Sequence, residues 1–322
     1  MIAPLSQYRY ITPLMIALNM ALVAALSVLG DYEPIMLWVN WLVAGLLSWG
    51  ILHTVARFRL EGGSDVRAFA ISWPIMTVGF NFAYCHFSGG SLFYPCLVEA
   101  FAFLCLLLLT ITFWKEERCV LPNIYSGLII GLASAFDAHI LLWSLFIPLW
   151  CRMMRSDDLR NMLGALTGIL LGIWVLYCGY FFFGGVHAAQ ALLTHYLELK
   201  PDLLLPYATW NIWQWIFLLL TAIVVLAYAI SGLVSFVGQT VRISTTVSFF
   251  SLLSLVVVAL YFFDMQHLCP YLMLLSILLS LQMTIHQSSD HSILQEYFIL
   301  VFIALGYALC IIQPVLTFFV AT

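Results

Sequence analysis

The side chains that could do chemistry are few, and most of them lie in short polar connections between long apolar runs. Asp31 and Glu33 share the sequence "GDYEP", and Asp137 and His139 share "DAH". Carboxylates and imidazoles supply general acids, general bases and ligands for divalent cations. We therefore take Asp31, Glu33 and Asp137 as candidate catalytic residues, with Asp31 or Asp137 as the general base that would deprotonate an acceptor hydroxyl. If the hydroxyl attacks a substrate that carries a diphosphate, a divalent cation would offset the charge of that diphosphate.

Five further residues are candidates for binding a ligand: His139, Asn81, Glu99, His187 and His195. Asn81 and Glu99 interrupt apolar runs, and a carboxyl group within hydrocarbon is costly enough to be a functional candidate. The alternative is that Glu99 hydrogen-bonds Asn81 and only joins two helices. A second alternative to a functional role applies to all of these candidates. Sorting of Lys and Arg to one side of a membrane by itself leaves acids and histidines on the other side.

The elements that position these residues are predicted to be membrane helices. Hydrophobic residues make up 64% of the 322 residues and charged residues only 8%. A soluble domain of this size needs more polar surface than that. The sequence therefore predicts an all-α, polytopic transmembrane helix bundle, and its slightly negative net charge indicates no nucleic-acid partner.

About eleven membrane segments are expected. Two of them form a short hairpin at 119–151, and the other nine are apolar runs near the length of about 20 residues that spans a bilayer. These nine runs are 11–29, 35–54, 68–87, 92–114, 160–183, 210–231, 245–263, 269–285 and 294–318.

The basic residues predict the orientation, because short cytoplasmic loops carry an excess of Lys and Arg. With a cytoplasmic N-terminus, ten of the eleven basic residues fall on the cytoplasmic side, and only Lys200 falls outside. Candidate acids and histidines in the connections then gather on the outer face.

The hairpin follows from the same charge count. Both "KEER" (115–118) and "CRMMRSDDLR" (151–160) are expected in the cytoplasm, so the chain between them crosses an even number of times. Each limb has about 16 residues and rises roughly 24 Å, which is less than a hydrocarbon core about 30 Å thick. Asp137 lies at the tip, where an alternative to catalysis is that it caps the helix that follows.

We expect one integral membrane domain over 1–322, with an interfacial amphipathic helix at about 186–199. Gly184 and Gly185 precede this helix and Pro201 ends it. The helix either closes the bundle or forms a lid above a substrate cavity. On a helical wheel, one face collects His187, Gln190, Thr194, His195 and Glu198.

Two resemblances bear on function. The stretch 123–185, with its Gly-rich hairpin, basic loop and Gly-punctuated helix, resembles a Bacteroidota family of polytopic inner-membrane proteins of unknown function. The helix layout is more weakly similar to C-type membrane glycosyltransferases, which use polyprenyl-phosphate sugars at the outer face. That resemblance implies that Asp31 and Glu33 match the acids of the first outer loop, although the connection here has only about five residues.

The sequence thus favours a multi-spanning protein of the bacterial inner membrane, in envelope biogenesis, that handles a lipid-linked glycan or another lipid at the outer face. Its expected partners are the bilayer, and a polyprenyl-phosphate lipid or other envelope membrane proteins. Two alternatives stay open: a non-catalytic subunit or scaffold of a secretion or motility machine, and a proton-coupled transporter with Glu99 as the coupling carboxylate. Whether the protein is an enzyme is left open.

Overall fold

The fold is all-helical in the part of the chain that the structure describes, as the sequence predicts. The structure is a computed structural model, and all eleven elements that it describes are helices. It describes residues 11–29, 33–57, 65–87, 93–112, 120–147, 151, 159–197, 211–235, 241–263, 268–289 and 293–321.

The helix boundaries agree closely with the apolar runs. The described helices are α1 (Ile11–Leu29), α2 (Pro34–Arg57), α3 (Asp65–Phe87), α4 (Phe93–Thr112), α5 (Val120–Ala133), η2 (Ala138–Phe146), α7 (Leu159–Leu197), α8 (Ile212–Ser235), α9 (Val241–Phe263), α10 (Leu268–Ser289) and α11 (Ile293–Ala321). Four described segments are long and apolar enough to cross a membrane: Pro34–Leu52, Leu159–Leu197, Ile212–Val234 and Leu268–Ile285. The larger number of eleven membrane segments stays a prediction. So does the cytoplasmic N-terminus, because most of the basic connections lie outside the described residues.

The chain divides into two compact units. Unit 1 consists of Met1–Gly90 together with Leu204–Thr322, and unit 2 consists of Ser91–Leu203. The single domain over 1–322 stays a prediction beside this division.

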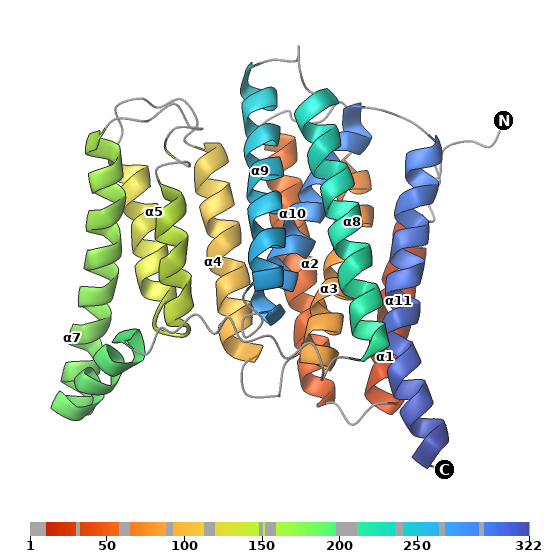
Figure 1. Cartoon of the computed structure of the whole chain (residues 1–322), viewed down its shortest axis with the longest axis horizontal. Helices are drawn as coiled ribbons and strands as arrows, with labels where there is room; N and C mark the ends of the chain where they lie inside the picture. Colours follow the sequence, from red (N-terminus) through yellow and green to blue (C-terminus); the bar gives the residue numbers. More distant parts are fainter. Residues whose placement is uncertain are drawn as a thin grey trace. The chain divides into compact units, whose positions relative to one another are not determined.

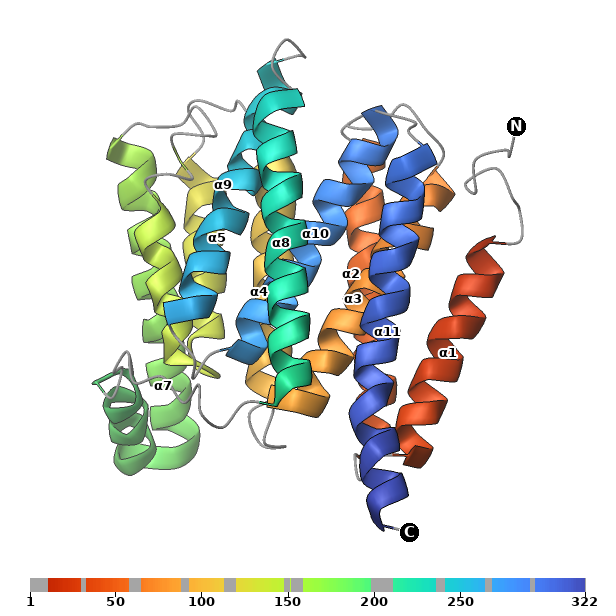
Figure 2. The same cartoon turned by 45° about the vertical axis from the view of Figure 1, so that its right-hand side comes forward.

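Unit 1 is built around α3 and α10. Residues 72–84 of α3 and 268–285 of α10 are all buried. The two helices pack closely where Gly79 meets Ser276. Helices α1, α2 and α11 pack on α3, while α8 and α9 pack on α10 (Figures 1 and 2).

Unit 2 contains α4, α5, η2 and α7. Helices α5 and α7 run side by side in both views (Figures 1 and 2), and α4 packs on α5. The α5–α7 contact is lined by glycines on both helices, four residues apart, as small residues are in closely packed membrane helices. These are Gly127 and Gly131 on α5, and Gly164, Gly168 and Gly172 on α7.

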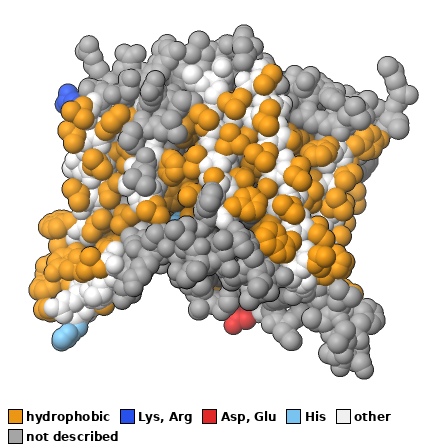
Figure 3. Space-filling model, in the orientation of Figure 1, with side chains coloured by type: hydrophobic (Ala, Val, Ile, Leu, Met, Phe, Trp, Pro, Cys, Tyr) orange, Lys and Arg blue, Asp and Glu red, His pale blue; other side chains and the backbone are white. Residues whose placement is uncertain are grey.

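Apolar side chains face outward and polar ones face inward in both units. On the face shown in Figure 3, hydrophobic side chains cover most of the described surface over α7, α8 and α11. Along α8 the exposed residues are Ile212, Ile216, Leu219, Ile223, Leu226, Ile230 and Val234. Buried positions include many Asn, Ser and Thr residues. This arrangement suits helices whose solvent is hydrocarbon.

The predicted hairpin is present and its limbs are short. The first limb is α5, with 14 residues, and the second is η2, a 3-10 helix of 9 residues. At about 1.5 Å and about 2.0 Å per residue, the limbs rise roughly 21 Å and roughly 18 Å. Both values are less than a hydrocarbon core about 30 Å thick. The sequence did not distinguish a 3-10 helix from an α-helix in the second limb.

Candidate functional site

Asp137 caps η2, as one of the two sequence interpretations expected. The chain leaves α5 at Ala133, turns through 134–136, and reaches Asp137 in an extended conformation (φ −147°, ψ 114°). The backbone N–H of His139 donates to the Asp137 carboxylate at 2.9 Å. This bond satisfies one of the amide donors that a helix start leaves open. The position of this carboxylate is therefore explained without a catalytic role.

Glu99 is the buried carboxyl group among the described residues of unit 2. Only 2% of its surface is exposed, on the second turn of α4. The Trp143 indole N–H of η2 donates to Glu99 Oε1 at 3.0 Å, and the Phe103 ring lies 5.3 Å from the Trp143 ring. A hydrogen-bonded indole lowers the cost of placing a carboxyl group in apolar surroundings. The contact therefore joins α4 to the hairpin.

His139 is also buried on η2, with 4% of its surface exposed. In a 3-10 helix, residues three positions apart share a face. Trp143 is four positions from His139, so the two side chains leave the helix about 120° apart. Trp143 uses its side chain to bond Glu99, whereas the bond from His139 to the cap comes from its backbone N–H. The hairpin thus turns its two aromatic polar groups in different directions.

The predicted amphipathic segment is a separate piece of helix. Gly185 has φ +73° and ψ −170°, which breaks the helical path of α7, and a positive φ suits glycine because it lacks a Cβ. Beyond this break the segment turns away from the rest of α7 (Figures 1 and 2). Ala189 and Leu192 form its buried face. Residues 186–197 are helical and the last two residues of the predicted segment 186–199 lie outside the described part, while its interfacial position stays a prediction.

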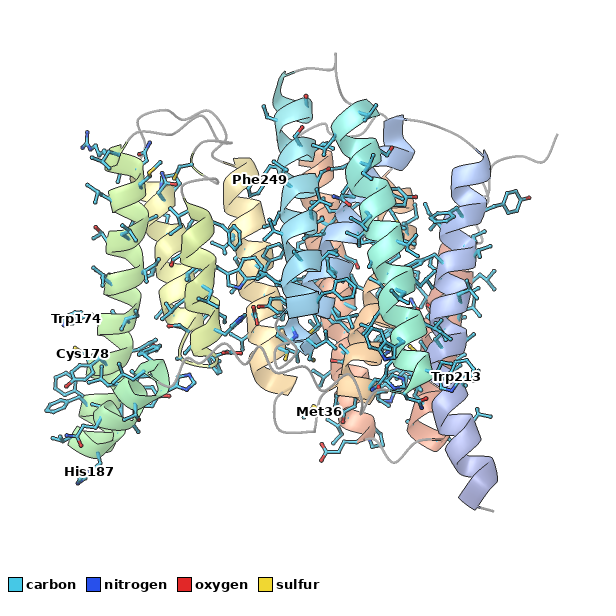
Figure 4. The ribbon with its side chains drawn as sticks, viewed as in Figure 1. Met36, Trp174, Cys178, His187, Trp213 and Phe249 are labelled. Atoms are coloured by element: carbon cyan, nitrogen blue, oxygen red, sulfur yellow. The ribbon has the colours of Figure 1, made fainter. Side chains whose placement is uncertain are left out.

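A hydrogen bond attaches this segment to the hairpin. The hydroxyl groups of Tyr196 and Ser134 lie 3.0 Å apart, and the Ser134 hydroxyl also contacts the Gly131 carbonyl oxygen at 2.6 Å. His195, next to Tyr196, is half-buried, whereas His187 is exposed. In Figure 4, His187 points away from the hairpin at the far side of the segment. The two histidines are thus not brought together.

The remaining candidates are dispersed. Asn81 belongs to unit 1, where it accepts a hydrogen bond at 3.4 Å from the Asn40 side-chain amide. Glu99 instead bonds Trp143 in unit 2. Glu33 is exposed at the start of α2, and Asp31 lies outside the described residues. Each of Asn81 and Glu99 thus has a hydrogen-bonded partner within its own unit.

A divalent cation finds no ready set of ligands in the described part of the chain. No group of three or more His, Cys, Asp or Glu side chains there could hold a metal ion. The cation was expected to accompany Asp31, which lies outside the described residues. It stays a prediction tied to that residue.

Sequence reasoning missed several residues that shape the site. Trp143 and Tyr196 were hidden because each fits a regular apolar or amphipathic pattern. Asn40 and Asn19 did carry a signal, since each is a lone amide within an apolar run. Reading lone amides as pairing candidates would have found them.

Substitutions of Asp137 distinguish capping from catalysis. Asp137→Ala should lower the apparent Tm of the purified protein by roughly 2–4 °C, because losing a cap costs about 1 kcal/mol. Asp137→Asn keeps a side-chain oxygen that accepts the His139 N–H, so its Tm should stay near that of the wild type. Thermal unfolding in detergent measures both. Equal losses in the two variants would contradict the capping role.

Comparisons with known proteins add no relative. No protein-family model matches the chain, and neither a curated protein nor a solved structure matches it. Conclusions about function therefore rest on the residues and geometry described above.

Proposed function

We propose that this chain is a multi-spanning protein of the bacterial inner membrane, acting in envelope biogenesis, that handles a lipid or lipid-linked glycan at the outer face. The single observation that carries the proposal is the contact between Tyr196 and Ser134. It holds an amphipathic helical segment against the tip of a short hairpin. Such a segment suits the boundary between acyl chains and headgroups.

The surface of α7 supports contact with lipid. Leu170, Trp174, Phe182 and Phe183 are 68%, 64%, 80% and 96% exposed. Trp174 and Cys178 project from the side of α7 in Figure 4. A helix this apolar on its exposed side is suited to hydrocarbon, and aromatic rings near its end suit the interface. The turn at Gly185 then carries the chain from the hydrocarbon region to the headgroup region.

The polar groups near the hairpin tip suit recognition of hydroxyl groups. Half-buried Tyr196 presents a hydroxyl, and half-buried His195 adds an imidazole. A sugar or phosphate ester could exchange hydrogen bonds with these groups. Lys200, which would offset a phosphate charge, follows the segment in the sequence.

Native mass spectrometry of the protein from mild detergent tests the proposal. We expect the wild type to retain a polyprenyl-phosphate or another envelope lipid. Tyr196→Phe removes the hydroxyl that bonds Ser134 and should reduce the retained lipid several-fold. Tyr177→Phe is the matched control, because it makes the same change on α7 before the break at Gly185.

Two results would overturn this proposal. Equal lipid retention in Tyr196→Phe and Tyr177→Phe would remove the role of the contact. Isolation of the protein without lipid but with a stoichiometric protein partner would favour the scaffold of a secretion or motility machine.

The glycosyltransferase-like form also requires Asp31→Asn, Glu33→Gln or Asp137→Asn to abolish sugar transfer without loss of folded protein.

A proton-coupled transporter is the second candidate, and buried Glu99 favours it. A carboxyl group at 2% exposure, bonded to an indole, is the kind of group on which proton coupling depends. Glu99→Gln keeps the oxygen that accepts from Trp143 but cannot release a proton. Proton-coupled uptake into proteoliposomes that vanishes in this variant would support transport. Unchanged uptake would remove Glu99 from that role.

A further inference from the structure

Among the fully buried polar side chains on three neighbouring helices of unit 1, four lie at similar depth. They are Asn19 on α1, Asn40 on α2, and Thr77 and Asn81 on α3, each with 0% of its surface exposed. We call these four residues the amide cluster. They lie in the unit that the lipid-handling proposal does not use.

The helices place these residues at two adjacent levels. Asn40 lies six residues after the start of α2, and Asn81 lies six residues before the end of α3. Each distance is about 9 Å along the helix axis. Asn19 lies ten residues before the end of α1, and Thr77 lies ten residues before the end of α3. Each distance is about 15 Å along the helix axis. Since α1 packs on both α2 and α3, the two levels are about one helical turn apart within the same helix group.

Asn19 lies on the buried face of α1. That face repeats every three or four residues and also contains Leu22, Val23 and Leu26. The opposite side, with Leu14 and Leu18, is exposed. In Figure 2, α1 runs alongside α11 at the edge of the drawing. The Asn19 amide therefore lies in the contact between α1 and its neighbours.

The hydrogen bonds within the cluster use only part of its capacity. Asn40 donates to Asn81 at 3.4 Å. In the part of the chain that the structure describes, five atoms of the cluster are buried and have no hydrogen-bond partner: Asn19 Oδ1, Asn19 Nδ2, Asn40 Oδ1, Thr77 Oγ1 and Asn81 Nδ2. Buried polar groups of folded proteins nearly always pair with protein or with water. Five such atoms on three helices that pack on one another therefore indicate a bound molecule.

The donors and acceptors among these five atoms indicate which kind of molecule can bind. The Asn19 and Asn81 amides still offer N–H donors, which a cation cannot accept. Asn19 and Asn40 still offer carbonyl oxygens, which an anion does not satisfy. If both side-chain amides of the Asn40–Asn81 pair are flipped, the hydrogen bond between them reverses. The pair is then still left with one unpaired N–H donor group and one unpaired carbonyl oxygen. A hydroxyl-type molecule that donates and accepts satisfies both kinds, and water is the one small enough for fully enclosed side chains.

We propose that the amide cluster binds ordered water molecules between α1, α2 and α3, which makes it an internal hydration site of unit 1. A buried water bridges about three polar groups, so two waters would serve the five open atoms. In hydrocarbon surroundings such waters stabilise the helix contacts, because bulk water cannot reach these groups.

Solid-state NMR on the wild-type protein in bilayers tests the proposal directly. With asparagine side-chain amides labelled with nitrogen-15, we expect magnetisation transfer from water to the Asn19 and Asn81 amides. Lipids with deuterated headgroups and chains remove lipid protons as a source. Loss of the transfer in those lipids would show that it came from carbon-bound lipid protons rather than from water, and would overturn the proposal. No transfer in either lipid would show a dry cluster and overturn it too.

A stability measurement gives a second, independent test. Thr77→Val has nearly the same shape, so it removes a hydrogen-bonding hydroxyl without leaving a cavity. Because the Thr77 hydroxyl bonds water in this proposal, the apparent Tm of Thr77→Val should fall by several degrees. Thr284→Val is the control, because that buried hydroxyl bonds the Ser280 carbonyl oxygen of its own helix at 2.8 Å. A rise in Tm for Thr77→Val would show that the hydroxyl is buried dry, and would overturn the proposal.

Discussion

Replacing Gly127 or Gly168 with alanine is expected to separate α5 from α7 and to cause the largest loss of stability of any single methyl group added to unit 2. A Cβ on Gly127 would overlap the Ala165 carbonyl oxygen, and a Cβ on Gly168 would overlap the Ile124 carbonyl oxygen. The backbones themselves are in contact, so no side chain can rotate to make room.

The neighbouring glycines show that this contact is continuous. A Cβ on Gly172 would lie 2.9 Å from the Gly131 Cα. Overpacking a core costs about 1–3 kcal/mol even where side chains can adjust. Because backbone must move here, we expect a fall of roughly 5–10 °C in apparent Tm, from about 2–4 °C per kcal/mol.

Gly179→Ala is the matched control on the same helix. A Cβ there would meet nothing within 4 Å, so the substitution should leave the Tm unchanged or raise it slightly through helix propensity. Thermal unfolding of Gly127→Ala, Gly168→Ala and Gly179→Ala in one detergent provides the comparison. Similar Tm values for all three would contradict the close α5–α7 contact.

Replacing Gly79 with alanine should destabilise unit 1, and Ser276→Gly should restore it. A Cβ on Gly79 would overlap the Ser276 hydroxyl and would lie 2.7 Å from the Ser276 Cβ. Both helices of this contact are buried on all sides over most of their length, so neither can move outward freely. We expect a fall of roughly 5–10 °C in apparent Tm for Gly79→Ala.

The rescue isolates the contact from other effects of the substitution. Ser276→Gly removes both atoms that the new Cβ would meet, at a cost of about 1 kcal/mol for a glycine within a helix. The double variant should therefore be more stable than Gly79→Ala alone, and its destabilisation should be smaller than the sum of the two single effects. Ser280→Gly, one turn further along α10, is the control and should not rescue. Rescue by both glycines would contradict the assignment.

Much of the fold could be predicted from the sequence. The apolar run 11–29 became α1 with the same boundaries, and the run 269–285 lies within α10. These boundaries were predictable because a helix in hydrocarbon must satisfy all its backbone hydrogen bonds internally, so hydropathy and length alone indicate it. The turn at Asp137 was predictable because the charge count required an even number of crossings.

The candidate site was less predictable. Glu99 and Asn81 were recognised as buried polar groups, but their hydrogen bonds to Trp143 and Asn40 were not anticipated. The partner of a buried polar group depends on which helices are neighbours and on how each is rotated. A single sequence does not contain either quantity.

The sequence by itself determined the helical class, most helix boundaries, the short hairpin and the break before the amphipathic segment. These are local properties, because they follow from hydropathy, glycine placement and the fixed rise of a helix. Only the tertiary structure decided that Trp143 bonds Glu99 and that Tyr196 reaches Ser134. Those contacts depend on helix packing between distant segments, where directional hydrogen bonds form only once neighbours and rotations are set.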